Sequence, residues 1–252
     1  MKISVVIPVL NSHEIVRRQL LHFSKMGWPR DCELILVDDG SDPPIHCPSD
    51  IAAPFLTILH TGDTRPWTWA LARNAGARIA SGEYLLMFDL DYILTREALE
   101  GVRGFTGQKR RFRREFGVLD EHGEFSQDEE TMKRYGLPEQ RIKQKGFKLP
   151  PHPNNFAILR ELYWEIGGFR EDVVDRPYPQ GEDRYFKQEW MKRVATGEVE
   201  DDDANTRPTL YMFPNGQFCG DVDYNPFDLF HDLTRKTDRN PWHKRCLKEG
   251  AR

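Results

Sequence analysis

Two aspartates separated by one residue interrupt an apolar stretch, YLLMFDLDYIL, at positions 84–94. Side chains along a strand alternate with a period of two, so we expect Asp89 and Asp91 to lie on the same side of the chain. Neighbouring carboxylates repel each other, and burying them without a compensating charge is costly. A hard divalent cation, Mg²⁺ or Mn²⁺, is the natural partner when phosphates complete its coordination shell. The alternative, a solvent-exposed acidic turn, is disfavoured by the apolar residues on both sides.

Short apolar strands and amphipathic helices alternate over the first hundred residues. Strands are expected at 3–8, where Pro8 would end the first one, and at 33–37, 55–59 and 84–88. Because these strands are apolar on both faces, they predict a mostly parallel sheet flanked by helices, which is an α/β fold.

Two helices are expected between these strands. Asn11 and Glu14 have the spacing of a capping box, which predicts that the first helix begins at Asn11. The second helix would end at Ser81-Gly82. Its buried face is predicted from four residues at helical spacing: Trp67, Leu71, Ala75 and Ile79.

Polar residues follow the predicted ends of three strands. Asn11 follows the first strand, Asp38 and Asp39 follow the second, and Asp89 and Asp91 follow the fourth. The carboxyl ends of parallel strands form the ligand-binding edge of such sheets. We therefore expect these side chains to gather at one site.

Four segments, in their order and spacing, resemble the family 2 glycosyltransferases, which have the GT-A fold. The segments are SVVIPVLNSHEIVRRQL, ELILVDDGSD, ARNAGARIASGEYLLMFDLD and EIGGFRED…GEDRYF, and the resemblance covers residues 3–100 and 150–195. It implies a metal-dependent, inverting transfer of a sugar from a nucleotide-sugar donor, a UDP-sugar, to a hydroxyl of a saccharide or glycoconjugate. It also implies one GT-A domain over 1–252, with a nucleotide-sugar half (1–100), an acceptor and catalytic half (101–230) and a C-terminal basic segment (231–252) that closes over the site.

The resemblance assigns a group of residues to the donor. Asp38 and Asp39 would hold the nucleotide, with Asp39 at the uracil edge, and Pro8 and Asn11 would line the same pocket. Arg73 would lie near the base or the diphosphate. The alternatives are turn capping for the two aspartates and a surface position for the arginine.

A second group is assigned to the metal and the phosphates. Asp89 and Asp91 would bind the metal-diphosphate, with Asp91 as the direct ligand of Mn²⁺ or Mg²⁺. His231 would be a further metal ligand, and Arg235 would meet the phosphates. A structural histidine and a solvated arginine are the alternatives at these two late positions.

The motif GED supplies the expected catalytic pair, Glu182 and Asp183. Asp183 would be the general base, and the N-terminus of a helix favours the ionised form that a base requires. Plain helix capping is the alternative. The same helix would bury Phe186, Trp190 and Val194, which recur at helical spacing.

A basic cluster stands outside these motifs: Lys109, Arg110, Arg111, Arg113 and Arg114, interleaved with Phe112. It suggests a second acceptor, a hydroxylated base of DNA, with phosphate contacts from the cations and stacking on the aromatic ring. A solvated surface that offsets the acidic run 198–203 is the alternative, and that run itself is expected to be a solvated loop. The net charge of −4 does not indicate a polyanion partner for the whole chain.

The remaining features restrict the class of protein. No signal peptide or apolar run of membrane-spanning length is recognised, so we expect a cytoplasmic enzyme without a membrane anchor. The four cysteines form no CxxC pair and are expected to be reduced. A nucleotidyltransferase would need a glycine-rich phosphate loop, which PVLNSHE lacks. A non-catalytic sugar-nucleotide-binding module is disfavoured by the intact Asp-x-Asp and Glu-Asp pairs.

Overall fold

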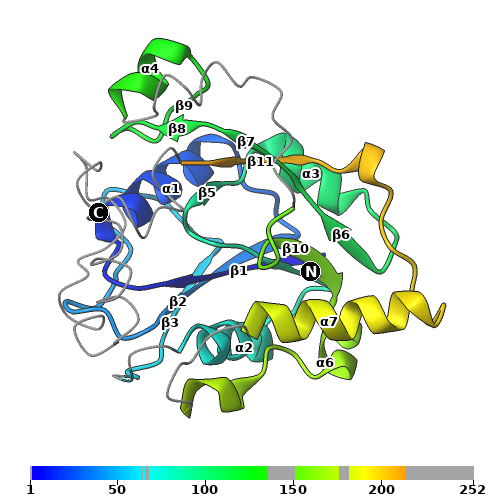
Figure 1. Cartoon of the computed structure of the whole chain (residues 1–252). Coiled ribbons are helices and arrows are strands. Elements are labelled where there is room, and N and C mark those ends of the chain that lie inside the picture. Colours follow the sequence, from blue (N-terminus) through cyan, green and yellow to red (C-terminus); the bar gives the residue numbers. More distant parts are fainter. Residues whose placement is uncertain (1, 64, 66–67, 136–150, 176–181, 214–252) are drawn as a thin grey trace, which may run out of the picture.

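The computed structural model describes residues 2–63, 65, 68–135, 151–175 and 182–213. Its centre is a six-stranded sheet with the order β3-β2-β1-β4-β10-β6 (Figure 1). Strands β3, β2, β1 and β4 are parallel, and β10 is antiparallel to both of its neighbours. The predicted mostly parallel α/β sheet is therefore confirmed. Its strands are β1 (Ile3–Val9), β2 (Cys32–Asp38), β3 (Leu56–His60), β4 (Tyr84–Met87), β6 (Lys109–Arg111) and β10 (Phe156–Leu159).

The first strand does not end at Pro8, as predicted, but continues to Val9. Pro8 lies opposite Val37 in the parallel ladder, and the next bond of that ladder runs from Asp39 N to Val9 O at 2.8 Å. Because the ladder continues through the carbonyl of Val9, the missing N–H of proline does not interrupt it.

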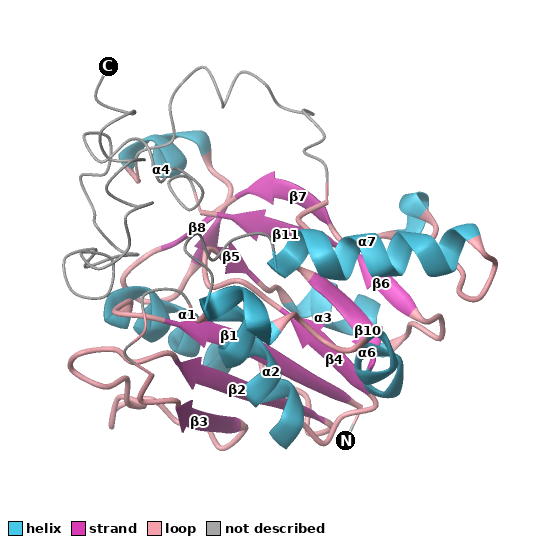
Figure 2. Cartoon of the chain, turned by 60° about the horizontal axis from the view of Figure 1, so that its bottom comes forward, coloured by secondary structure: helices cyan, strands magenta, loops and turns pink. Residues whose placement is uncertain are grey.

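Helices cover both faces of this sheet (Figures 1 and 2). Helices α1 and α3 share one apolar core with β1, and helices α2, α6 and α7 share the other. The helices are α1 (His13–Lys25), α2 (Trp69–Ile79), α3 (Arg96–Arg103), α4 (Glu129–Arg134), α6 (Arg160–Ile166) and α7 (Glu182–Ala195), and two short 3₁₀ helices span Glu171–Asp175 and Ala204–Thr206.

A second, three-stranded sheet has the order β5-β11-β7 (Figure 1). A two-stranded ribbon, β8-β9, and helix α4 follow strand β7 along the chain. The strands are β5 (Tyr92–Ile93), β7 (Arg113–Phe116), β8 (Val118–Leu119), β9 (Phe125–Ser126) and β11 (Thr209–Met212).

The predicted capping box at the start of α1 is wrong. The helix begins at His13, and its N-cap residue, Ser12, makes no side-chain capping bond. Asn11 has a positive φ of 50°, and its Oδ1 accepts a hydrogen bond from Asp42 N at 2.9 Å. Glu14 pairs with Arg18 instead of capping the helix. The side chain of Asn11 therefore joins two loops.

The predicted buried face of α2 is wrong at Ile79, whereas Leu71 and Ala75 pack against the core from partly buried positions. Ile79 is 47% exposed, Leu71 and Ala75 are half-buried, and Trp67 lies outside the described residues. Small residues face the sheet instead: a Cβ atom on Gly76 would lie 2.5 Å from Val6 Cγ1. Close approach of the helix to the strands thus selects a stripe of small side chains that hydrophobicity alone does not indicate. On α7, by contrast, Phe186 and Trp190 are buried as predicted, and Val194 is partly buried.

The basic cluster at 109–114 is not an exposed surface. Lys109 is buried, with its Nζ 4.7 Å from the ring centres of both Phe156 and Trp190. Arg114 is also buried and donates to the hydroxyl of Tyr92 at 2.7 Å. Phe112, the ring proposed to stack on a base, is 1% exposed. The cluster therefore gives no support to a DNA acceptor.

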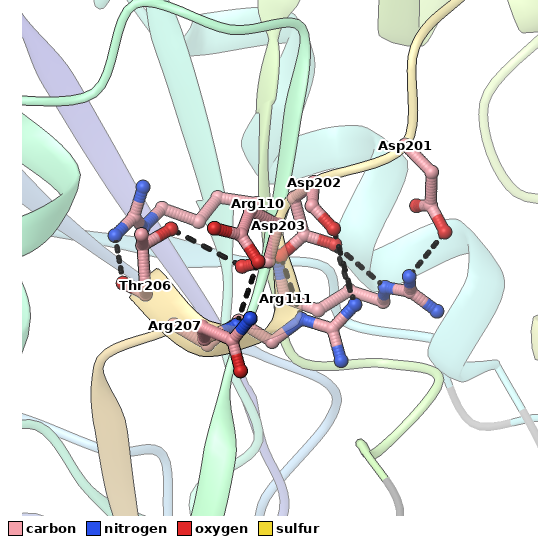
Figure 3. Close-up of polar contacts among 8 residues, drawn as sticks. Arg110, Arg111, Asp201, Asp202, Asp203, Thr206 and Arg207 are labelled. Atoms are coloured by element: carbon pink, nitrogen blue, oxygen red, sulfur yellow. Dashed lines mark hydrogen bonds and ion pairs between the residues drawn. The ribbon is translucent and has the colours of Figure 1, made fainter.

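The acidic run that follows α7 contributes to the same region, and the prediction that it is wholly solvated is wrong. Asp202 is 2% exposed and pairs with Arg111 at 2.9 Å and with Arg207 at 2.8 Å (Figure 3). Burial opposes ionisation of Asp202, but hydrogen bonds from the two arginines outweigh it and lower its pKa. Asp201 pairs with Arg111 from a more exposed position. These ion pairs attach the loop to strand β6.

Within the described part of the chain, no helix is both long enough and apolar enough to cross a membrane. Cys32 and Cys47 are free thiols, as predicted, and Cys219 and Cys246 lie outside the described residues.

The buried carboxylate of Asp202 yields a stability prediction. Asp202→Ala leaves Arg207 without its ion-pair partner and removes one of the two carboxylates that pair with Arg111, and we expect the free energy of unfolding to fall by about 3–5 kcal/mol. Asp201→Ala is the matched control and should cost less than about 1 kcal/mol, because that side chain is partly solvated. Urea denaturation of the two variants measures the difference. Equal losses would show that the loop is not held by Asp202.

Candidate active site

The loops after β1 and β2 meet at the carboxyl edge of the main sheet. The parallel register places Val9 beside Asp38, so the residues that follow these strands are neighbours. Asn11 donates from its backbone N to Ser41 Oγ at 2.8 Å and accepts from Asp42 N with its side chain. The loop that carries Asn11 is therefore in contact with the loop that follows Asp38 and Asp39, and a shared binding site of these residues stays a prediction.

Asp38 organises the turn in which it lies. Its Oδ1 accepts from Ser41 N at 2.9 Å, and its Oδ2 accepts from Ile45 N and lies within hydrogen-bond distance of His60 Nδ1, both at 2.9 Å. Burial opposes ionisation, but these contacts prevail and lower its pKa. The arrangement matches the turn-capping alternative for Asp38, and a nucleotide contact by this residue stays a prediction.

Asp39 is held at the start of α2. The hydroxyl of Thr68, the N-cap residue of that helix, lies 2.7 Å from one carboxylate oxygen of Asp39 and 2.6 Å from the other. Asp39 is 1% exposed. Pro8 is also buried, one residue before the end of β1.

Asp89 lies between two basic side chains. Its Oδ1 is 2.6 Å from Arg73 Nη2, and its Oδ2 is 3.1 Å from His152 Nδ1. Its backbone N–H donates to Asn155 Oδ1 at 2.7 Å. Burial opposes ionisation, but the charge of Arg73 and the contact with His152 hold the pKa of Asp89 well below its usual range. Arg73 is itself buried, so the alternative of a surface arginine is excluded.

His152 is a site residue that sequence reasoning missed. Strand β10 is antiparallel to β4, with Phe156 opposite Met87, so residues just before β10 lie beside residues just after β4. Burial lowers the pKa of His152, but the hydrogen bond and the charge of Asp89 outweigh it, and the pKa is raised. Only knowledge of this strand pairing would have pointed to the histidine.

Asp91 has no ion-pair partner among the described residues. Burial and the nearby charge of Asp89 raise its pKa to about 7. Its backbone carbonyl accepts a hydrogen bond from Phe213 N at 3.0 Å, so the last described residue after β11 lies against it. The two aspartates of the motif therefore differ: Asp89 is neutralised by protein groups, whereas Asp91 is not.

A divalent cation fits this arrangement, because it would supply the positive charge that Asp91 lacks beside an already ionised carboxylate. The described residues contain no group of three or more His, Cys, Asp or Glu side chains arranged to hold a metal by themselves. The protein would thus supply few ligands here, as is usual where substrate phosphates complete the shell. His231 and Arg235, predicted for this site, lie outside the described residues.

The predicted base lies at the start of α7. Asp183 is the second residue of that helix, and Phe186, one turn later, stacks on Phe156 with ring centres 5.0 Å apart. Phe156 directly follows Asn155, which binds the backbone of Asp89. These contacts connect α7 to β10 and, through Asn155, to the backbone of Asp89. Glu182 is the first residue of α7.

Comparison with solved structures supports the fold. The mannosyltransferase PcManGT from Pyrobaculum calidifontis, in complex with GDP-Man and Mn²⁺, has a TM-score of 0.51 and 20% identity over 82% of this chain and 56% of that one. TarS 1–349 from S. aureus has a TM-score of 0.47 and 19% identity over 75% of this chain and 55% of that one. The chain spans about half the length of these proteins.

Comparison with curated proteins gives no match. The α/β architecture is the GT-A fold that the sequence motifs predicted. The family model of glycosyl transferase family 2 matches residues 4–167, which is more than half of the chain. The chain belongs to glycosyl transferase family 2.

Proposed function

We propose that this chain is a metal-dependent, inverting glycosyltransferase that moves a sugar from a nucleotide-sugar donor to an acceptor hydroxyl. The observation that carries the proposal is the asymmetric acidic pair: Asp91, with a pKa raised to about 7, lies beside an ionised Asp89 at the carboxyl edge of the sheet. Family membership supports the reaction class.

A bound Mn²⁺ or Mg²⁺ would neutralise the diphosphate leaving group. Asp91 would be its direct protein ligand, and Asp89, fixed by Arg73 and His152, would orient the metal-diphosphate. A role for His231 as a further ligand and for Arg235 at the phosphates is part of the proposal.

Asp183 would take the proton from the acceptor hydroxyl, with Glu182 beside it in the motif. Asp183 lies in the first turn of α7. The acceptor oxygen then attacks the anomeric carbon opposite the departing diphosphate, so the configuration at that carbon inverts. The bond from the sugar to the diphosphate breaks as the new glycosidic bond forms, and the proton stays on Asp183.

A UDP-sugar is the proposed donor, with Asp39 at the base, Pro8 and Asn11 lining the pocket, and Asp38 shaping the adjoining turn. The P. calidifontis mannosyltransferase holds GDP-Man, so GDP-mannose belongs in the same screen. A saccharide or glycoconjugate is the proposed acceptor. The DNA alternative is not continued, because the cations that motivated it are largely buried or paired.

The donor proposal predicts metal-dependent nucleotide binding. Calorimetry with UDP, UDP-sugars and GDP-mannose should show binding with Mn²⁺ and little without it. Asp91→Ala should abolish the metal-dependent part, whereas Asp50→Ala, which changes an exposed carboxylate paired with Arg17, should not. Undiminished binding by Asp91→Ala would remove the metal assignment.

The raised pKa of Asp91 predicts a pH dependence of metal binding. A carboxyl must lose its proton before it can bind a cation, and a pKa near 7 means that most Asp91 side chains are protonated at pH 6 and ionised at pH 8. Mn²⁺ affinity should therefore rise about tenfold from pH 6 to pH 8. Titration of Mn²⁺ followed by electron paramagnetic resonance measures this change. An affinity that is flat over this range would contradict the assigned protonation state.

The proposed base predicts a loss of rate without a loss of binding. Asp183→Asn keeps the size of the side chain but cannot accept the proton, so transfer should slow by at least about a hundredfold. Donor affinity should stay close to that of the wild type. Glu189→Gln, on the same helix and exposed, is the matched control and should transfer normally. A near-normal rate for Asp183→Asn would exclude it as the base.

A further inference from the structure

Helix α1 carries a buried amide that the donor and acceptor assignments do not use. Gln19 is 2% exposed and lies among apolar core residues of the same helix: Ile15, Val16, Leu20 and Phe23. Its Oε1 is buried and has no hydrogen-bond partner. A buried acceptor without a partner is destabilising, so an apolar side chain would suit this core position better. The amide nitrogen of Gln19, Nε2, must therefore explain why a glutamine occupies this position.

The amide nitrogen of Gln19 binds the backbone of the acidic motif. Gln19 Nε2 donates to Leu90 O at 3.3 Å and also to Tyr92 O. These two carbonyls belong to the residues on either side of Asp91. One amide nitrogen thus holds the carbonyls of the two residues that flank Asp91, the aspartate that makes no ion pair with a described residue.

The segment around Asp91 is a tight turn, closed by a hydrogen bond from Tyr92 N to Asp89 O at 3.2 Å. Asn155 binds Asp89 N, and Phe213 N binds Asp91 O at 3.0 Å. Gln19 adds side-chain hydrogen bonds to the carbonyls of Leu90 and Tyr92. The turn is thus held at the two residues that flank Asp91, in addition to the bonds at Asp89 N and at the carbonyl of Asp91.

We propose that Gln19 is a positioning residue for the metal-diphosphate site, because it sets the direction of the Asp91 carboxylate through the turn at residues 89–92. The inference rests on the proposed function, since it assigns to Asp91 the role of metal ligand. Gln19 itself touches neither metal nor donor. It acts as residues behind a metal ligand commonly do, by restricting the orientation of that ligand.

The test compares metal affinity with stability in Gln19→Met, which keeps the length of the side chain and removes the donor. We expect Mn²⁺ affinity, measured by electron paramagnetic resonance without nucleotide, to fall at least about tenfold. UDP binding in the presence of Mn²⁺ should weaken in parallel. The melting temperature should change little. The substitution removes two hydrogen bonds, which is destabilising, but it also removes the buried Oε1 that has no partner, which is stabilising. Gln188→Met, on the exposed face of α7, is the matched control.

An unchanged Mn²⁺ affinity in a folded Gln19→Met protein would overturn the proposal, as would a loss of stability with metal affinity intact. If Gln19→Met does not fold, Gln19→Asn provides the same comparison, since its shorter amide cannot reach both carbonyls. Failure of the wild-type protein to bind Mn²⁺ and UDP would count against the proposed function. Normal wild-type binding with an unaffected variant would count against Gln19 alone.

Discussion

The structure depends on compensating two carboxylates at the buried end of a central strand. Strand β4 lies between β1 and β10, and Phe88 and Leu90, which flank Asp89, are both buried. Charge in such a place requires a partner. Asp89 obtains its partners from Arg73 on α2 and from His152, just before β10. Helix α2, which packs on β1 and β2, and strand β10, which pairs with β4, must therefore lie as observed for the motif to be tolerated at all.

The described residues provide ion-pair partners for Asp89 but not for Asp91. Protein cations keep Asp89 ionised and lower its pKa. Burial, together with the charge of Asp89, makes ionisation of Asp91 unfavourable and raises its pKa to about 7. If both carboxylates had a protein cation, a metal would gain little by binding. If neither had one, both would bind protons in competition with the metal. In the observed arrangement, Asp91 is the carboxyl group whose ionised form a bound cation would favour.

The sequence was sufficient for features that depend on one strand or one helix at a time. Buried parallel strands appear as apolar runs, and the residues after them necessarily share an edge, which is why Asn11 and Asp89 could be placed there. Features that depend on pairing between distant segments could not be predicted. His152 reaches Asp89 only because β10 is antiparallel to β4. Ile79 has helical spacing but is exposed, because α2 approaches the sheet with small residues.

The basic cluster is another feature that depends on contacts between distant segments and could not be predicted, and part of it contacts the acidic turn. Alternation along adjoining strands β6 and β7 separates its cations. Arg111 binds the loop at Asp202, whereas Arg114 binds Tyr92, and the charge of Arg114 partly offsets the rise in the pKa of Asp91. Asp89 follows a strand of the main sheet, and Tyr92, next to Asp91, begins a strand of the second. The turn between them is thus one of the places where the chain passes from one sheet to the other. Any movement of one sheet against the other would change the separation of the two carboxylates, so the packing that joins the sheets also fixes the geometry of the site.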